Sequence, residues 1–280
     1  MFFEGFVLQT VECGEVALRV RHGGAGPPVV LLHGHPRTHT TWWRVAPLLV
    51  DAGFTVVCPD LPGYGESERT PRQTKREIAA ALAAMMEALG FASYAVVGHD
   101  RGSPCAHRLA VDHGATRLAL MDGIPIVEHL ERCDDRFAAA WWHWFFFAQT
   151  AKPAEDIINR DPLGWYRVDR ESLGPDNYDD WRRAVTNPDV VRAMVEEYRA
   201  GFEVDRHDEA ADRAAERFVR CPVLIAWSAR DDLEELYGDP VGVWRPWTLG
   251  PLTGVRIDSG HHMAEEAPEE LASALADFLR

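Results

Sequence analysis

The chain has 280 residues, 46% of them hydrophobic, which is enough to bury one main core but short for two independent enzymatic domains. Its 29 basic residues stand against 44 acidic ones, so the formal net charge is −15 and binding to nucleic acid or to an anionic membrane surface is disfavoured. The five cysteines are scattered, and none forms a C-x-x-C pair. This pattern argues against a disulfide framework or a zinc site and fits a reducing cytoplasm.

Two segments were candidates for targeting the chain to a membrane, and neither has the required pattern. The first ten residues lack the basic region and the small-residue cleavage site of a secretory signal. The most apolar stretch, residues 138–148, is too short to span a bilayer and contains a histidine. We therefore expect a cytoplasmic protein with no membrane partner.

Short apolar runs alternate with helical patterns along both ends of the chain. Residues 6–12 and 16–21 predict two strands around a turn at Gly14. Later apolar runs predict buried strands at residues 28–32, 55–58, 94–97, 118–121, 223–227 and 254–257. The intervening patterns predict helices at residues 73–89, 103–113 and 268–279. This alternation predicts a mainly parallel sheet with helices on both faces and an antiparallel leading edge.

The alternation stops near Pro125 and resumes near Pro222. The segment between them is rich in Trp, Phe, Arg and Asp and shows no convincing strand pattern. We therefore expect a core domain made of residues 1–125 and 221–280, with residues 126–220 inserted as a helical cap. Ligands in such sheets bind outside the carboxyl ends of the strands, so a cap there would enclose the site and exclude water.

Residues 98–102, Gly-His-Asp-Arg-Gly, form the clearest candidate site. They lie between a predicted strand and a predicted helix and match the G-x-nucleophile-x-G elbow, with Asp100 at its centre. A carboxylate nucleophile attacks an sp³ carbon and forms an ester that water then hydrolyses. A simple tight turn would have the same glycine pattern, so the interpretation depends on the rest of the chain.

Other predicted strands end in segments that would complete such a site. Residues 33–36, His-Gly-His-Pro, follow a buried strand, and the backbone N–H of His35 would help to form an oxyanion hole with that of Arg101. Residues 259–262, Ser-Gly-His-His, follow the last strand and offer a histidine as general base. The order nucleophile, acid, histidine along the chain is typical of α/β-hydrolases.

In these motifs the chain resembles the α/β-hydrolases and, within them, the haloacetate (fluoroacetate) dehalogenases. The resemblance covers nearly the whole chain. Its motifs are the elbow at 98–102, the segment 120–125 around Asp122, the tail at 259–261 with 265–268, and the cap segments His-Trp at 143–144 and Glu-Tyr-Arg-Ala-Gly at 197–201. The elbow motifs are shared with epoxide hydrolases, whereas the cap motifs are more specific to the dehalogenases.

The resemblance implies a hydrolytic dehalogenase that converts a short 2-haloacid, such as fluoroacetate, to the 2-hydroxyacid and halide. Asp100 would be the nucleophile, Asp122 would orient His261, and His261 would activate the water that hydrolyses the aspartyl ester. The substrate would be a small molecule, and no metal or other cofactor is expected. The resemblance alone also suggests a homodimer.

The resemblance further assigns donors to the leaving halide and to the substrate carboxylate. His143, Trp144 and Tyr198 would donate an imidazole N–H, an indole N–H and a phenol O–H to the halide. Arg101 would hold the carboxylate. Without the resemblance, Trp144 would be interpreted as core packing, because it lies in the aromatic run at residues 141–147.

Two departures from the dehalogenase pattern leave alternatives open. The family carries a second arginine four residues after the nucleophile, and here that position is Pro104. Without the guanidinium group of that second arginine, recognition of a substrate carboxylate is weaker. A bulkier, differently bound or uncharged substrate is therefore an alternative. Arg37 is a candidate to reach the pocket instead. Asp231, just after the strand at 223–227, is the alternative acid partner to Asp122.

Two other functions compete with the dehalogenase. An epoxide hydrolase would use the same nucleophile but would need phenol donors, for which Tyr198 could pair with Tyr166, Tyr178 or Tyr237. The other is a non-catalytic ligand receptor on the same fold. The intact set of Asp100, Asp122 and His261 argues against a receptor.

Overall fold

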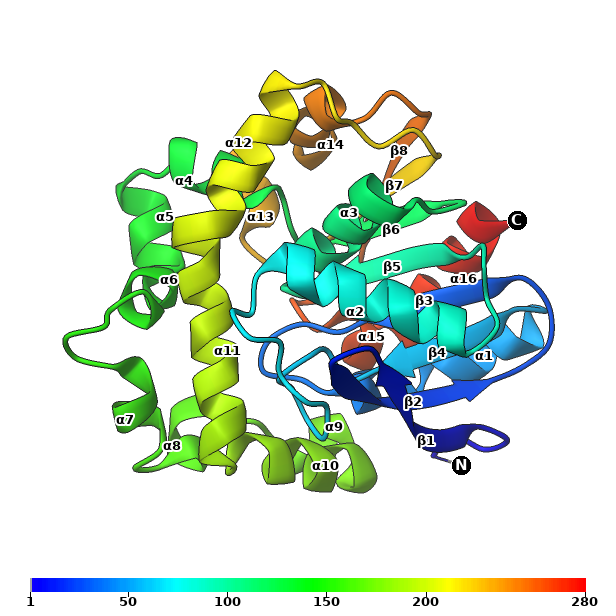
Figure 1. The fold of residues 1–280 in the computed structure, drawn as a ribbon, viewed down its shortest axis with the longest axis horizontal. Coiled ribbons are helices and arrows are strands. Elements are labelled where there is room, and N and C mark those ends of the chain that lie inside the picture. The colour runs from blue at the N-terminus through cyan, green and yellow to red at the C-terminus, as the bar shows by residue number, and fades with distance from the viewer. Residues whose placement is uncertain (1) are drawn as a thin grey trace.

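The computed structural model describes residues 2–280, and an eight-stranded sheet runs through its centre (Figure 1). The strands are β1 (Val7–Cys13), β2 (Val16–Gly23), β3 (Pro28–Leu32), β4 (Thr55–Pro59), β5 (Ala95–His99), β6 (Leu118–Met121), β7 (Val223–Ser228) and β8 (Leu252–Ile257). Their order across the sheet is β1-β2-β4-β3-β5-β6-β7-β8. Strands β3 to β8 pair in parallel and the β1 and β2 pairings are antiparallel, which confirms the predicted sheet.

Helices cover both faces of the sheet, as the strand sequences require. They are α1 (Val45–Asp51), α2 (Lys75–Ala88), α3 (Gly102–His113) and α16 (Pro268–Leu279). Val30 and Leu32 of β3 enter the core that α2 and α3 cover, whereas Val29 and Leu31 enter the core under α1 and α16. Successive side chains of a strand point to opposite faces, so a strand buried on both faces is apolar throughout.

The three predicted helices are present, and the first illustrates their local signals. The side chain of Thr74 accepts a hydrogen bond from the N–H of Glu77 and so satisfies one of the open donors at the start of α2. Ile78, Leu82 and Met85 then fall on one buried face. The amphipathic pattern therefore predicted both the helix and the side that packs on the sheet.

Between β6 and β7 the chain forms a layer of helices at one end of the sheet (Figure 1). They are α4 (Ile126–Glu131), α5 (Asp135–Ala140), α6 (Trp142–Phe147), α7 (Ala154–Ile158), α8 (Pro162–Tyr166), α9 (Arg170–Leu173), α10 (Pro175–Val185), α11 (Pro188–Ala200), the π-helical turn η2 (Gly201–Asp205) and α12 (Arg206–Ala214). In Figure 1, α11 and α12 run end to end as one long column beside α6. We propose that residues 126–220 act as a cap on a core made of residues 1–125 and 221–280. Met1 of that predicted core lies outside the described residues.

Short helices complete the connections between the strands. They are η1 (His39–Trp43), α13 (Leu233–Tyr237), α14 (Pro240–Trp244), η3 (Arg245–Trp247) and α15 (Met263–Glu266). Across residues 2–280, no helix combines the length and the apolar character needed to cross a bilayer.

Candidate active site

The turn that carries Asp100 connects β5 to α3, as the sequence predicted. Asp100 has a φ of 51°, which is uncommon for a residue with a side chain. A Cβ on Gly98 would lie 2.2 Å from the carbonyl oxygen of Gly102, and a Cβ on Gly102 would lie 2.4 Å from that of Leu32. Both glycines are therefore required by close packing, which distinguishes a nucleophile elbow from an ordinary exposed turn.

The loop after β3 places a backbone donor on Asp100, the predicted nucleophile. The N–H of His35 donates to Oδ1 of Asp100 at 2.7 Å. Gly34 permits this approach, since a Cβ there would lie 2.3 Å from the same oxygen. If an ester formed on Asp100, as the sequence predicted, this N–H would be in place to stabilise the oxyanion that develops when water attacks.

His261 lies between the nucleophile and two further carboxylates. Its Nε2 is 3.6 Å from Oδ2 of Asp100, and its Nδ1 is 2.7 Å from Oδ2 of Asp231 and 3.7 Å from Oδ2 of Asp122. Burial opposes protonation of the ring, but hydrogen bonds to Asp100 and Asp231 and the nearby negative charge raise the pKa of His261 well above its usual range. Burial likewise acts to raise the pKa of Asp100, but its hydrogen bond with His261 and the charge of that ring outweigh burial and lower it.

The direct hydrogen bond of His261 therefore goes to Asp231, the alternative acid, and not to Asp122, which the sequence favoured. Asp122 is instead engaged by Ser228, whose backbone N–H donates to Oδ1 at 2.8 Å and whose hydroxyl contacts Oδ2. The two carboxylates end neighbouring parallel strands, β6 and β7, so both reach the same imidazole. Tertiary contacts then decide which one bonds to it.

A cavity of about 430 Å³ opens above Asp100, between the core and the helical layer. Its wall is dominated by aromatic side chains: Trp141, Trp142, Trp144, Phe147, Trp165, Tyr166 and Tyr198. Asp231, Asp232, His35, His143, His261 and His262 also line it. Of all these lining residues, each within the described part of the chain, none is a lysine or an arginine.

Comparison with known proteins identifies the family. The family model described as alpha/beta hydrolase fold matches residues 27–264. The chain belongs to the α/β-hydrolases. Over 99% of its length it is 33% identical to a fluoroacetate dehalogenase from Burkholderia sp, of which it covers 95%. It is also 29% identical to a soluble epoxide hydrolase from Corynebacterium sp. (strain C12), with 91% of each chain covered. An α/β hydrolase structure from Nostoc sp PCC 7120 matches with a TM-score of 0.94 and 34% identity over 99% of both chains.

The predicted halide donors of this α/β-hydrolase all line the cavity with Asp100. His143, Trp144 and Tyr198 form a cluster, with the rings of His143 and Trp144 centred 5.9 and 5.7 Å from that of Tyr198. Burial lowers the pKa of His143 to about 4, so its imidazole is neutral near pH 7 and offers one N–H. The part of these residues in catalysis remains a prediction.

The structure separates the three tyrosines that the sequence offered as partners for Tyr198. Tyr166 lines the cavity, and its buried hydroxyl has no hydrogen-bond partner among residues 2–280. Tyr178 instead packs against Trp181, with ring centroids 5.3 Å apart. The hydroxyl of Tyr237 lies 2.6 Å from Nδ1 of His129. Tyr166 is thus the tyrosine that the fold brings beside Tyr198 and Asp100.

Arg101 is not available to a substrate in the way that the sequence predicted. Its Nε and Nη2 donate to the carboxylate of Glu197 at 2.9 and 2.8 Å, and the two side chains are 3% and 1% exposed. The ammonium group of Lys75 contacts the same carboxylate. The guanidinium stacks on the ring of Tyr198, 4.1 Å from its centroid. Glu197 immediately precedes Tyr198 in the chain, but its partner 96 residues earlier was not evident from the sequence.

The space beside Arg101 is also too small for a carboxylate. A hollow lined by Asp100, Arg101 and Pro104 has a volume of about 10 Å³, which is close to the limit for a single water molecule. Pro104 stands where the dehalogenases carry their second arginine. Arg101 therefore lines this small hollow and not the 430 Å³ cavity above Asp100.

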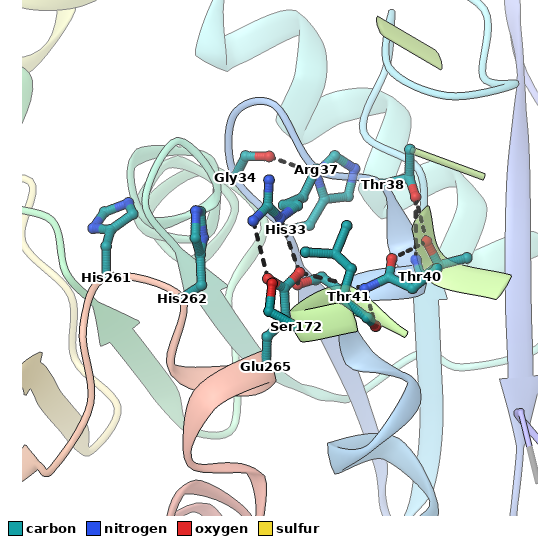
Figure 2. Close-up of polar contacts among 12 residues, drawn as sticks. His33, Gly34, Arg37, Thr38, Thr40, Thr41, Ser172, His261, His262 and Glu265 are labelled. Carbon is teal, nitrogen blue, oxygen red and sulfur yellow. Dashed lines mark hydrogen bonds and ion pairs between the residues drawn. The ribbon is translucent and has the colours of Figure 1, made fainter. Parts of the chain in front are cut away.

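Arg37, which was a candidate to reach the pocket, points instead to α15 (Figure 2). The backbone N–H of Arg37 donates to the carbonyl oxygen of Gly34 at 2.9 Å and closes a turn in the loop. Its guanidinium forms a buried bidentate ion pair with the carboxylate of Glu265, with N–O distances of 2.9 and 3.0 Å. The hydroxyl of Thr41 adds a bond to Glu265 at 2.8 Å. This pair ties the loop that carries His35 to the segment that follows His261.

Proposed function

We propose that this α/β-hydrolase opens epoxide rings of neutral substrates and releases diols through a covalent ester on Asp100. The observation that carries the proposal is the pair of phenols, Tyr166 and Tyr198, in an aromatic cavity above the nucleophile. The buried Tyr166 hydroxyl has no partner in the described chain, so it is a donor that a ligand oxygen would satisfy.

The charge of the cavity favours a neutral substrate over a haloacid. Asp100 and Asp231, both with lowered pKa values, face it together with Asp232, and the one imidazolium, His261, is already shared between carboxylates. A substrate carboxylate at about 4 Å from the Asp100 carboxylate, without a counter-cation, would be repelled by about 4 kcal/mol at an effective dielectric constant of about 20. This repulsion would weaken the binding free energy by the same amount. That amount is comparable to a thousandfold loss of affinity.

In the first step, Oδ2 of Asp100 attacks an epoxide carbon while Oδ1 keeps its bond to the N–H of His35. The ring C–O bond breaks, and the leaving oxygen takes a proton from Tyr166 or Tyr198. Burial raises the pKa of both phenols, so each is a weak acid in the resting site and donates only to a strong base such as the developing alkoxide.

Ester formation prepares the second step by removing the charge on Asp100. That charge and hydrogen bond are major causes of the raised pKa of His261, so esterification lowers this pKa and the Nε2 proton can return to the phenolate. Neutral His261, oriented by Asp231, then takes a proton from water as it attacks the ester carbonyl. The acyl C–O bond breaks, and the leaving oxygen takes the second proton of the attacking water, so the diol leaves. The resting pair of Asp100 carboxylate and His261 imidazolium is then restored.

Conversion of styrene oxide to its diol tests the proposal, with fluoride and chloride release from fluoroacetate and chloroacetate measured in parallel. Diol formation that is lost in Asp100→Asn supports it. His261→Gln should stop after the first step, so mass spectrometry should show the intact chain plus one equivalent of substrate. Halide release without diol formation would contradict the proposal.

A second candidate is the dehalogenase function, which His143 and Trp144 support as N–H donors beside Asp100. The relative named a fluoroacetate dehalogenase is 33% identical to this chain. The engaged Arg101 and the 10 Å³ hollow favour a neutral organohalide over a haloacid here. Halide release from an uncharged alkyl halide, but not from fluoroacetate, would support this function.

A further inference from the structure

One hydroxyl group lies between two acceptors beside the catalytic histidine. Oγ of Ser228 contacts Oδ2 of Asp122 and is 2.7 Å from the carbonyl oxygen of Gly260. Ser228 and Asp122 are buried, with 1% and 2% of their surfaces exposed. The hydroxyl has one proton, whereas an ionised carboxylate and a carbonyl can only accept. With Asp122 ionised, one of these two short oxygen–oxygen contacts would have no hydrogen.

The nearest additional hydroxyl does not remove this conflict. Oγ of Ser259 lies 3.5 Å from Oγ of Ser228, so it can donate weakly to Ser228. Such a bond would supply no proton to the contact with Asp122 or to the contact with Gly260. A proton on Asp122 itself would supply the missing hydrogen.

We propose that Asp122 is a neutral carboxylic acid that positions the loop of His261, while Asp231 is the single ionised partner of that histidine. Oδ2–H of Asp122 donates to Oγ of Ser228, whose own proton goes to the carbonyl oxygen of Gly260, while Oδ1 accepts from the backbone N–H of Ser228 at 2.8 Å. Every polar group of this chain of bonds is then satisfied. This series of hydrogen bonds connects the ends of β6 and β7 to Gly260, the residue immediately before His261.

The electrostatic surroundings of Asp122 agree with the neutral form. Burial and the charge of Asp231 together raise the pKa of Asp122 to about 7, against the lowering effect of His261 and of the bonds from Ser228. The other titratable group that faces it is His99, with a ring nitrogen within 4.8 Å. That ring bonds to the carbonyl oxygen of His261 through Nε2 at 2.7 Å, and burial lowers its pKa to about 4, so it brings no positive charge.

Asparagine is a close mimic of a neutral aspartic acid, and this gives the test. In Asp122→Asn the amide can donate to Ser228 and accept from its N–H, so diol formation should stay within about threefold of the parent. In the matched variant Asp231→Asn, the charge that stabilises the His261 imidazolium is lost, and activity should fall about 10³–10⁴-fold. A loss in folded Asp122→Asn as large as in Asp231→Asn would overturn the proposal.

Infrared spectroscopy tests the proton directly and without a substrate. At about pH 6, the difference spectrum between the parent and Asp122→Asn should contain the carbonyl band of a protonated carboxylic acid, and the absence of that band would overturn the proposal. The activity comparison rests on the proposed function, but the infrared band does not. If the parent converts no epoxide, the proposed function fails and the band still decides the state of Asp122.

Discussion

Replacing Arg37 by methionine should destabilise the protein strongly, because it leaves the carboxylate of Glu265 buried without its cation. Both side chains are 4% exposed, and two N–H groups of Arg37 lie 2.9 and 3.0 Å from the two oxygens of Glu265. The bonds that remain are those from Thr41 at 2.8 Å and from Asn177 at 3.4 Å. Removing one partner of a buried pair costs about 3–5 kcal/mol, so we expect about 4 kcal/mol here.

Urea unfolding measures this cost. With a denaturant slope of about 3 kcal/mol per molar, a loss of about 4 kcal/mol lowers the unfolding midpoint by roughly 1.3 M. The matched control is Arg192→Met, which removes an exposed pair with Asp189 at 3.8 Å and should leave the midpoint almost unchanged.

The double variant Arg37→Met/Glu265→Leu separates the buried charge from the lost contacts. It removes both charges, so it should be more stable than the sum of the two single changes predicts. A midpoint for Arg37→Met within about 0.3 M of the parent, or strict additivity in the double variant, would refute the reasoning.

Three further results are expected. Tyr198→Phe should lower epoxide turnover about 100-fold without changing the melting temperature, since it removes one acid but keeps the ring. Gly98→Ala should lower the unfolding free energy by about 3 kcal/mol, measured by thermal unfolding, because the new Cβ would lie 2.2 Å from the carbonyl oxygen of Gly102. Burial lowers the pKa of His33 and His99 to about 4 and of His107 to about 3. They gain protons on unfolding below about pH 6.5, so the free energy of unfolding should fall by about 1.4 kcal/mol per histidine and pH unit as the pH drops from 6.5 towards 4. Denaturant midpoints should fall with it, and an unchanged midpoint would contradict this.

Sequence patterns predicted the fold because the relevant interactions are local or periodic. The run at 28–32 is apolar at every position because both faces of β3 are covered, and this property is visible in the chain itself. The elbow at 98–102 was recognisable for a similar reason, since the glycines that pack against α3 and β3 lie two residues before and two residues after Asp100. Comparison with known proteins confirmed the family that these motifs predicted.

The availability of charged side chains was decided by contacts between distant parts of the chain. Arg101 meets Glu197 from 96 residues away, and Arg37 meets Glu265 from 228 residues away. An arginine beside a nucleophile has the same local sequence whether its charge is free or neutralised. Only the packing of α11 against the core shows that the charge of Arg101 is paired with the carboxylate of Glu197.

The sequence by itself predicted the sheet and identified Asp100 and His261 as candidate site residues, because each prediction follows from a pattern of neighbouring residues. It also placed two acids, Asp122 and Asp231, at the ends of adjacent strands. The tertiary structure alone decided that Asp231 bonds to His261, at 2.7 Å against 3.7 Å for Asp122, since Ser228 engages the latter. Hydrogen bonds depend on differences of a few tenths of an ångström, and the chain fixes such distances only when it is folded.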